Sequence, residues 1–491
     1  MILRLITFAI ISFTSLPNSG KEILTSAEMH HDLAVLHSTL INLHPGLYRY
    51  NTSRQIENYF NDASRYCDND RSEASFYLLL SKLTALIKCG HTYLNPLNLD
   101  DSISGRILPQ TVVPFFFKVL NNKMIVTHSV IPEQHVKTGD EILSINGVTI
   151  KRIIDSLILV SRADGRNALG KKINNINETP DEADNKSLFD IYYPLFFPTK
   201  SNEYTIKFKP AGSSQILNTK IEFITFSKRT LLFESIYGKV PKAELTWRYR
   251  KVNSSTAYMK FGTFAFWNSK FNTKNFIDSI FNDLRTHHSI KNLVIDIRGN
   301  EGGDNSGSYI LKYISKEQIL CDTSSRSCYR FLKIPDSLQK YLTTWDRSFK
   351  QPKDPNNYKL NELGLYQEIN KKYPCETSSD PSYKFSGHVI LLTDAKNSSA
   401  GYEMARDFKQ YHLGEIIGET TGGTKQGING GEFLFLTLPN SKFEIDIPLI
   451  FNYYPNEPDE GIKPDHFVST TQKDIMINRD AQLDKAIQLL K

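Results

Sequence analysis

The residues with the clearest potential for chemistry are 397–401, which read Asn-Ser-Ser-Ala-Gly. They follow an apolar run at 389–393 and precede a stretch in which Met404, Phe408 and Tyr411 recur with helical spacing. A hydroxyl at a strand-to-helix turn is held rigidly, and the amides of the helix start point toward incoming negative charge. This arrangement suits a serine nucleophile. The alternative is that the two serines only cap the helix.

Three other short stretches could contribute to the same chemistry. Residues 89–94 read Cys-Gly-His-Thr-Tyr-Leu, residues 298–303 read Arg-Gly-Asn-Glu-Gly-Gly, and residues 418–423 read Gly-Glu-Thr-Thr-Gly-Gly. A histidine with an ordinary pKa near 6.5 can act as a base at neutral pH. Glycines let backbone amides approach a tetrahedral intermediate closely. The alternatives are a structural histidine and a plain strand-to-helix turn.

The elements that must position these residues can be predicted from hydrophobic spacing. Leu33, Leu36, Leu40 and Leu43 recur at spacings of three and four, which predicts a helical N-terminal region that continues to about residue 105. Strand patterns follow at 112–117, 123–127 and 136–147, the last closing with Asn-Gly, a strong hairpin signal. Further strands are predicted at 204–208 and 221–226, and residues 155–200 are interpreted as a polar insertion with helices.

From about residue 246 the pattern alternates between strands and helices. Apolar strands at 257–261, 293–297, 389–393 and 415–417 are separated by helical stretches, which predicts a largely parallel sheet with active groups at its carboxyl ends. Residues 316–384 form a long polar segment with several prolines, and segments of that length are usually lids or substrate-facing insertions.

Taken in order, these motifs resemble the tail-specific, or C-terminal-processing, serine proteases, with relatives in the tricorn core and the interphotoreceptor retinoid-binding repeats. The resemblance extends from His44-Pro45 to Pro464-Asp465 and includes a strand-turn motif of PDZ type at 139–147. It implies a multidomain α/β protein whose catalytic domain has a mostly parallel, ClpP/crotonase-like sheet. The expected domains are a signal peptide (1–20), a helical N-terminal domain (21–105), a PDZ-like β-rich domain with an insertion (106–230) and an α/β serine protease domain (231–491).

The resemblance also assigns roles. In the family a Gly-Glu pair begins nineteen residues after the reactive serine, which makes Ser399 the nucleophile and Ser398 the second choice. The expected oxyanion donors are the amides of Gly302, Gly303 and Ala400.

The base departs from the processing-type pattern. The family lysine twenty-five residues beyond the serine would fall at Thr424, and Lys425 is one position further on. The tricorn-like branch uses a histidine in a Gly-His-Thr segment, which His91 matches, oriented by a downstream carboxylate. Glu457 lies in the matching region and Glu460 is a near alternative. A lysine would need strong desolvation to act as base, so His91 is preferred over Lys425.

Composition limits the other possibilities. A formal charge of +6, with no run of five or six like charges among 491 residues, gives little support to nucleic-acid binding. No HExxH or CxxC spacing is present, so no metal site and no cofactor are expected. The α/β-hydrolase elbow G-x-S-x-G is also missing.

The N-terminus indicates export. Arg4 precedes an apolar run of about twelve residues, which is typical of a signal peptide and too short for a membrane span of about 20 residues. We therefore expect a periplasmic, cell-surface or secreted protein without a membrane span. Cys321 and Cys328 could pair in an oxidising compartment.

The resulting hypothesis is an exported serine endopeptidase that hydrolyses peptide bonds in unfolded or C-terminal polypeptide segments. The alternative is a non-catalytic ligand-binding protein of the same fold, since the retinoid-binding relatives carry apolar ligands without proteolysis. If the chain is a peptidase, the PDZ-like region would bind the substrate peptide as an extra strand at the edge of its sheet.

Overall fold

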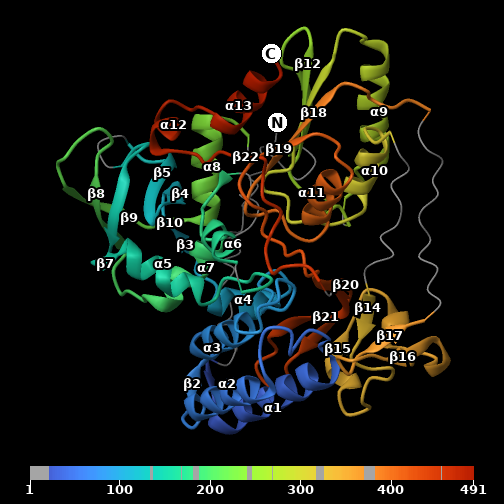
Figure 1. The fold of residues 1–491 in the computed structure, drawn as a ribbon. Coiled ribbons are helices and arrows are strands. Elements are labelled where there is room, and N and C mark those ends of the chain that lie inside the picture. Colours follow the sequence, from blue (N-terminus) through green and yellow to red (C-terminus); the bar gives the residue numbers. More distant parts are fainter. Residues whose placement is uncertain are drawn as a thin grey trace, which may run out of the picture.

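The structure is a computed structural model, and it describes residues 22–491 except 133–135, 167, 181–186, 240–245, 268, 317–325, 370–381 and 455. The predicted signal peptide and Cys321 lie outside the described residues, so export and the pairing of Cys321 with Cys328 stay predictions. Figure 1 shows helices at the bottom, a β-rich group at the left, an α/β group at the top and a further group of strands at the lower right.

The N-terminal group is helical, as its leucine spacing predicts. Capping boxes at Thr25 and Thr52 start its first two helices, and Leu33, Leu36 and Leu40 are buried. The two-stranded pair β1 and β2 adjoins the helices. The bounds are β1 (Ile23–Leu24), α1 (Ser26–Leu43), α2 (Ser53–Tyr66), β2 (Arg71–Ser72), α3 (Glu73–Ala85) and α4 (Asp101–Ile107).

The β-rich group is built on an antiparallel sheet of order β4-β5-β6-β8-β9, with β7 beside β6. Its predicted Asn-Gly turn is confirmed, because Asn146 and Gly147 have φ of 49° and 77°, as an Asn-Gly hairpin turn requires. The strands are β4 (Phe115–Leu120), β5 (Lys123–Ser129), β6 (Glu141–Ile145), β7 (Val148–Thr149), β8 (Glu203–Lys209) and β9 (Leu217–Glu222).

Helices accompany this sheet, including those expected within 155–200. The prediction of one strand over 221–226 is wrong at its end, because Phe226 begins a helix that the Thr225 hydroxyl caps. The remaining elements are β3 (Thr111–Val112), α5 (Ile150–Ile158), α6 (Leu169–Asn174), α7 (Leu188–Phe196), β10 (Ile224–Thr225) and α8 (Phe226–Tyr237).

The α/β group confirms the predicted sheet. Its order is β11-β12-β13-β18-β19-β22, and every neighbouring pair after the antiparallel edge strand β11 is parallel. The strands are β11 (Trp247–Lys251), β12 (Thr256–Phe261), β13 (Asn292–Asp296), β18 (His388–Thr393), β19 (Glu415–Gly418) and β22 (His466–Phe467).

Helices cover both faces of the sheet. Leu293 and Ile295 face a core shared with α9, α10 and α11, whereas Val294 packs in a smaller cluster with Ala486 of α13. Burial on both faces explains why these strands are continuous apolar runs. The helices are α9 (Thr273–Thr286), α10 (Ser306–Lys312), α11 (Ala400–Gln410), α12 (Gln472–Met476) and α13 (Ala481–Leu489).

A third sheet lies beside the N-terminal helices and was not predicted. It is centred on the hairpin of β20 (Asn429–Thr437) and β21 (Glu444–Tyr453), which packs near α1 in Figure 1. Its order is β15-β20-β21-β14-β17-β16, so the polar segment 316–384 supplies strands and not only loops. Its other elements are β14 (Arg326–Tyr329), β15 (Leu342–Thr343), β16 (Tyr358–Leu360) and β17 (Tyr366–Glu368).

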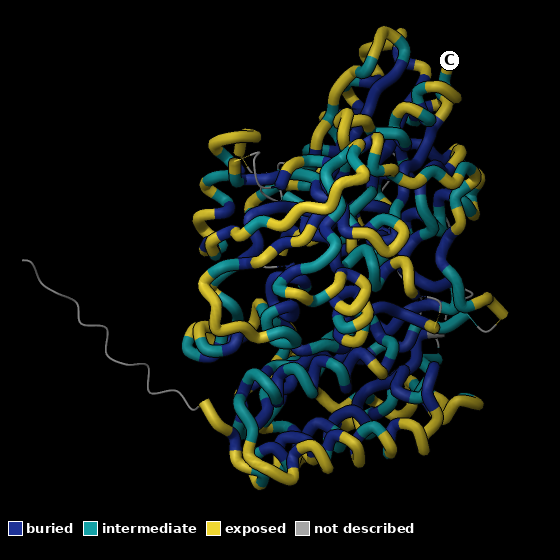
Figure 2. The backbone as a smooth tube through the Cα atoms, turned by 90° about the vertical axis from the view of Figure 1, so that its left-hand side faces the viewer, coloured by how far each residue is buried: buried dark blue, intermediate teal, exposed yellow. Residues whose placement is uncertain are grey.

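Two large cores organise the chain. One joins the N-terminal helices, the β-rich sheet and the β20–β21 hairpin, with Leu36, Phe117 and Ile445 as members; the other lies in the α/β group. Figure 2 shows buried backbone running through the interior, with exposed segments at the outside. None of the helices formed by the described residues is long and apolar enough to cross a bilayer.

Candidate active site

Ser399 lies at the turn between β18 and α11. It occupies the N-cap position, but its side chain makes no capping hydrogen bond, so the interpretation of Ser399 as a helix cap is not what the structure shows. Its backbone has φ 51° and ψ −132°, which is costly for a residue with a Cβ. A hydroxyl held on a strained strand-to-helix turn, and unused by that turn, is the arrangement that serine hydrolases use to present a nucleophile.

Asn397 fixes this turn. Its side chain is fully buried, donates to the carbonyls of Ile297 (2.5 Å) and Asn300 (3.2 Å), and accepts from the Asp394 amide at 2.8 Å. Its own carbonyl accepts from the amide of Gly422 at 2.8 Å. One asparagine therefore joins the serine turn to the end of β13 and to the glycine-rich stretch after β19.

The glycine turn after β13 lies directly against the serine. A Cβ on Gly302 would be 2.7 Å from Ser399 Cβ and 2.8 Å from the nitrogen of Ala400. The Gly302 amide donates to Asn300 Oδ1 at 2.8 Å, so its use as an oxyanion donor would compete with that bond. Gly303 has φ 140° and packs so closely on Phe264 that a Cβ would be 2.0 Å from its carbonyl oxygen. The roles of Gly302, Gly303 and Ala400 stay predictions.

The β20–β21 hairpin positions the loop that contains His91. Asn95 N donates to Glu444 O and Asp446 N donates to Tyr93 O, each at 3.1 Å, so the His91 loop runs along β21. The imidazole contacts the ring of Phe433, with centroids 5.6 Å apart. Its Nδ1 is buried and has no hydrogen-bond partner among the described residues.

The charges that act on His91 come from two segments, residues 162–171 and the glycine turn that contains Glu301. Burial lowers its pKa below 6.5, the Asp164 and Glu301 carboxylates oppose this, and the cations of Arg162 and Lys171 add to it. Asp164 also accepts from the Gly90 amide at 2.9 Å, next to His91. The histidine is therefore held neutral, as a base must be.

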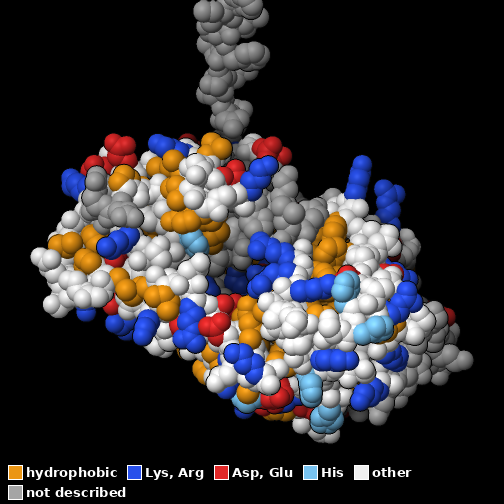
Figure 3. Space-filling view, turned by 90° about the horizontal axis from the view of Figure 1, so that it is seen from above, with side chains coloured by type: hydrophobic (Ala, Val, Ile, Leu, Met, Phe, Trp, Pro, Cys, Tyr) orange, Lys and Arg blue, Asp and Glu red, His pale blue; other side chains and the backbone are white. Residues whose placement is uncertain are grey.

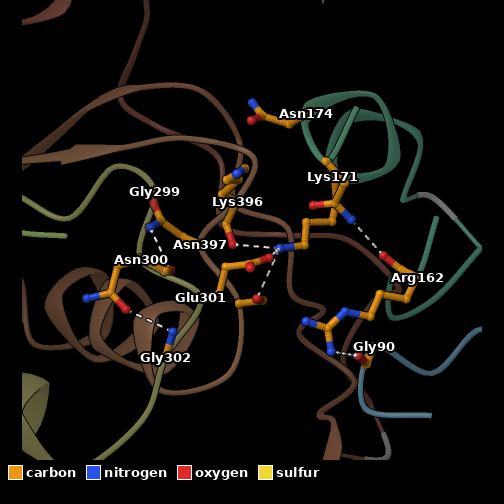
Figure 4. A network of polar contacts seen from close by, with 12 residues as sticks. Gly90, Arg162, Lys171, Asn174, Gly299, Asn300, Glu301, Gly302, Lys396 and Asn397 are labelled. Atoms are coloured by element: carbon orange, nitrogen blue, oxygen red, sulfur yellow. Dashed lines mark hydrogen bonds and ion pairs between the residues drawn. The ribbon is translucent and has the colours of Figure 1, made fainter. Parts of the chain in front are cut away.

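Lys171 connects the segments. It is 5% exposed, and its Nζ donates to the carbonyl of Lys396 at 3.0 Å and to Ser398 Oγ at 3.4 Å, and forms an ion pair with Glu301. Figure 4 shows this ammonium between Glu301 and the Lys396 carbonyl, with Arg162 and Gly90 on the side from which α6 approaches. The serine turn and the neighbourhood of His91 thus meet at the Lys171–Glu301 pair.

The other predicted residues lie at the surface. Lys425 Nζ pairs with Glu460 at 3.0 Å, and Glu460 also binds Lys463 at 2.5 Å. Glu457 is exposed, and its amide donates to the carbonyl of Tyr454. Neither glutamate is among the charged groups that shift the pKa of His91. Their assignment as orienting carboxylates stays a prediction.

A cleft of about 1030 Å³ lies between the β-rich and α/β groups and reaches this site. Glu301 and Lys396 are on its wall, together with basic side chains from both groups, including Lys118, Lys260 and Arg298. Figure 3 shows the surface hollowed between the two groups, with Lys and Arg side chains at the border. The cleft is large enough for several residues of an extended peptide.

Three charged residues near the site were not predicted from the sequence, and all lie in the segment interpreted as a polar insertion: Arg162, Asp164 and Lys171. No motif marks them, and nothing in the sequence separates Lys171 from its neighbour Lys172. Only the fold shows that Lys171 faces the serine turn. Among the described residues, no cluster of three or more His, Cys, Asp or Glu could hold a metal ion.

Residues 255–466 match the sequence model of peptidase family S41. A search of curated protein sequences finds no significant match. Among solved structures, the chain is similar to mature CPAF complexed with lactacystin, with 9% identity, a TM-score of 0.61, and 95% of this chain and 98% of that chain covered. The CPAF S499A mutant gives 11% identity, a TM-score of 0.62, and coverages of 95% and 97%. The photosystem II D1 C-terminal processing protease gives 14% identity and a TM-score of 0.41, with 95% of this chain and 98% of that chain covered.

Proposed function

We propose that this chain, whose residues 255–466 match the model of peptidase family S41, is a serine-type peptidase with Ser399 as its nucleophile and His91 as its general base. The observation that carries this proposal is the turn at Ser399. Its strained backbone holds the serine next to Gly302, and its hydroxyl makes no capping hydrogen bond to the helix. The burial that keeps His91 neutral supports the second assignment.

The reaction proceeds in two halves. Ser399 Oγ attacks the carbonyl carbon of the scissile bond while His91 takes the hydroxyl proton, and amides from Gly303 and Ala400, with Gly302, hold the oxyanion. When the intermediate collapses, the C–N bond breaks and the leaving amine takes the proton from His91. Water then attacks the acyl-enzyme, again with His91 as base, and releases Ser399.

His91 is a better base than Lys425 in this geometry. The Lys425 side chain forms an ion pair with Glu460 at a partly exposed position. The lowered pKa of His91 leaves it unprotonated at neutral pH. For the carboxylate that orients the imidazole we retain Glu457 and Glu460 as candidates. We add Asp164, because its carboxylate raises the pKa of His91.

The substrate is proposed to be an unfolded or C-terminal polypeptide segment, and the protein to be exported to the periplasm, cell surface or medium. A cleft of about 1030 Å³ beside the serine turn suits an extended chain better than a folded domain. The neighbouring antiparallel sheet, proposed to be PDZ-like, offers strand edges to which such a chain could be added.

A fluorophosphonate probe tests the nucleophile. We expect one adduct on Ser399, retained in Ser398→Ala and lost in Ser399→Ala. Cleavage of denatured casein should fall at least on the order of 10³-fold in Ser399→Ala, because the attacking atom is removed. Full cleavage by a folded Ser399→Ala variant would refute the assignment, and absence of both labelling and cleavage by the wild type would favour the ligand-binding alternative.

The base is tested by paired substitutions. We expect His91→Ala to lose casein cleavage and Lys425→Ala to keep measurable turnover. The reverse result would place the chain among the Ser-Lys peptidases.

A further inference from the structure

One buried lysine contacts the serine turn, the glycine turn and the glycine-rich stretch after β19. Lys171 donates to Lys396 O and Ser398 Oγ in the serine turn and pairs with Glu301 in the glycine turn. Its stem passes Gly422, where a Cβ would lie 2.8 Å from Lys171 Cδ. An ammonium has three N–H donors, and these three polar contacts occupy all of them.

Two of the three polar partners of this lysine are next to the groups that would react. Glu301 immediately precedes the two glycines proposed as oxyanion donors, and Ser398 immediately precedes Ser399. The same cation is therefore bonded to one neighbour of the nucleophile and to one neighbour of the oxyanion amides. Since Lys171 is 5% exposed, little water competes for these contacts.

We propose that Lys171 is a positioning residue of the peptidase, whose ammonium holds the glycine turn at 299–303 in register with the serine turn at 397–401. The inference rests on the proposed function, because it concerns the same site. Lys171 is not a general base in this arrangement, since its nitrogen has no lone pair to accept a proton while it serves as the cation of the Glu301 pair. Its effect on the reaction acts through the two turns that it joins.

The ion pair has a second consequence, for the charge of His91. The charged groups that act on His91 are Asp164, Arg162, Lys171 and Glu301. After burial, which lowers the pKa most, the lysine lowers it and Glu301 raises it. Removing one charge or the other should therefore move the pKa of His91 in opposite directions.

The kinetic test compares Lys171→Met with Lys172→Met, the same change one position along the same helix. We expect Lys171→Met to lower kcat on a peptide substrate on the order of 10–100-fold, with KM within about twofold, because misplaced turns affect the transition state. The rate of fluorophosphonate labelling at Ser399 should fall in parallel. Lys172→Met should match the wild type in both measurements.

The pH profile separates positioning from a general loss of fold. Loss of the Lys171 charge should move the acid limb of kcat/KM to higher pH, and Glu301→Gln should move it to lower pH. Glu301 is 43% exposed, so its replacement also tests the ion pair if Lys171→Met does not fold. Unchanged kcat and acid limbs in the folded variants would overturn the inference, as would activity losses that only follow the loss of folded protein.

The same labelling experiment distinguishes a failure of the proposed function from a failure of the role of Lys171. If the wild type is not labelled at Ser399, the proposed function fails. If the wild type is labelled but Lys171→Met is labelled at the same rate, only the role of Lys171 fails.

Discussion

Gly302 lies so close to Ser399 that a side chain at position 302 would place its Cβ 2.7 Å from the Cβ of the serine. The glycine also has φ 103°, which residues with a Cβ rarely adopt. Both facts indicate that the approach of the two turns requires glycine at this position. The relationship explains, in physical terms, why a Gly-Gly pair follows the buried strand of this domain.

We expect Gly302→Ala to lower kcat on the order of 100-fold, because the serine turn must shift to relieve the contact. Strain should also cost about 1–3 kcal/mol of stability. Gly364→Ala is the matched control: its φ of 68° is also positive, but its Cβ would meet open space. Kinetics and thermal unfolding of both variants measure the difference, and equal activity losses would contradict this account.

The pH dependence of kcat/KM should report His91. Burial lowers its pKa, and a base is active only when unprotonated, so activity should rise through an acid limb below pH 6.5 and stay constant above it. Asp164→Asn should move this limb to still lower pH, because the carboxylate raises the pKa. The Gly90 amide would keep its acceptor in this variant.

The same measurement ranks the carboxylates near the site. Glu457→Gln and Glu460→Gln should leave the acid limb in place if Asp164 is the acid coupled to His91. A shift in either glutamate variant, with none in Asp164→Asn, would instead support the downstream assignment.

Asn397→Ala should destabilise the protein by about 3 kcal/mol and reduce labelling of Ser399. The change leaves the Asp394 amide without its Asn397 acceptor and removes one of the two donors to the Ile297 carbonyl, which keeps the Asn300 amide. Asn397→Asp should be at least as damaging, because its carboxylate would face two carbonyl oxygens. Urea unfolding checks both, with exposed Asn253→Ala as a control expected to cost less than about 1 kcal/mol.

Asp446 should make the protein less stable as pH rises. Burial raises the pKa of this carboxyl to about 7, although Arg162 opposes the change. Its pKa in the unfolded chain is about 3.9, so the folded state holds the extra proton between these values and loses stability as pH rises from about 4 through 7. Asp446→Asn, which cannot ionise, should flatten the melting temperature over this range by the equivalent of roughly 2–4 kcal/mol. An unchanged slope would show that other groups dominate.

The sequence predicted those parts of the fold whose signals are local. Continuous apolar runs at 293–297 and 389–393 identified central parallel strands, and Asn146-Gly147 identified its hairpin turn. The β20–β21 hairpin was missed, although Leu434 and Leu436 are buried in it, because its packing partners are far away along the chain.

The candidate site was predictable only where motifs mark it. The strained turn at Ser399 coincides with the motif that indicated it. Lys171 could not be found, because its role depends on α6 approaching a turn more than two hundred residues later in the chain. Spacing records periodicity within an element and contains no information on which elements meet.

The bond network between Asn95 and Asp446 spans 351 positions, which has a consequence for synthesis on the ribosome. The His91 loop is hydrogen-bonded to β21, so it cannot take up its folded position until residues 444–453 have left the ribosome. Contacts of such long range form late in folding. With His91 as the proposed base, a nascent chain would be unable to cleave peptides until translation is almost complete.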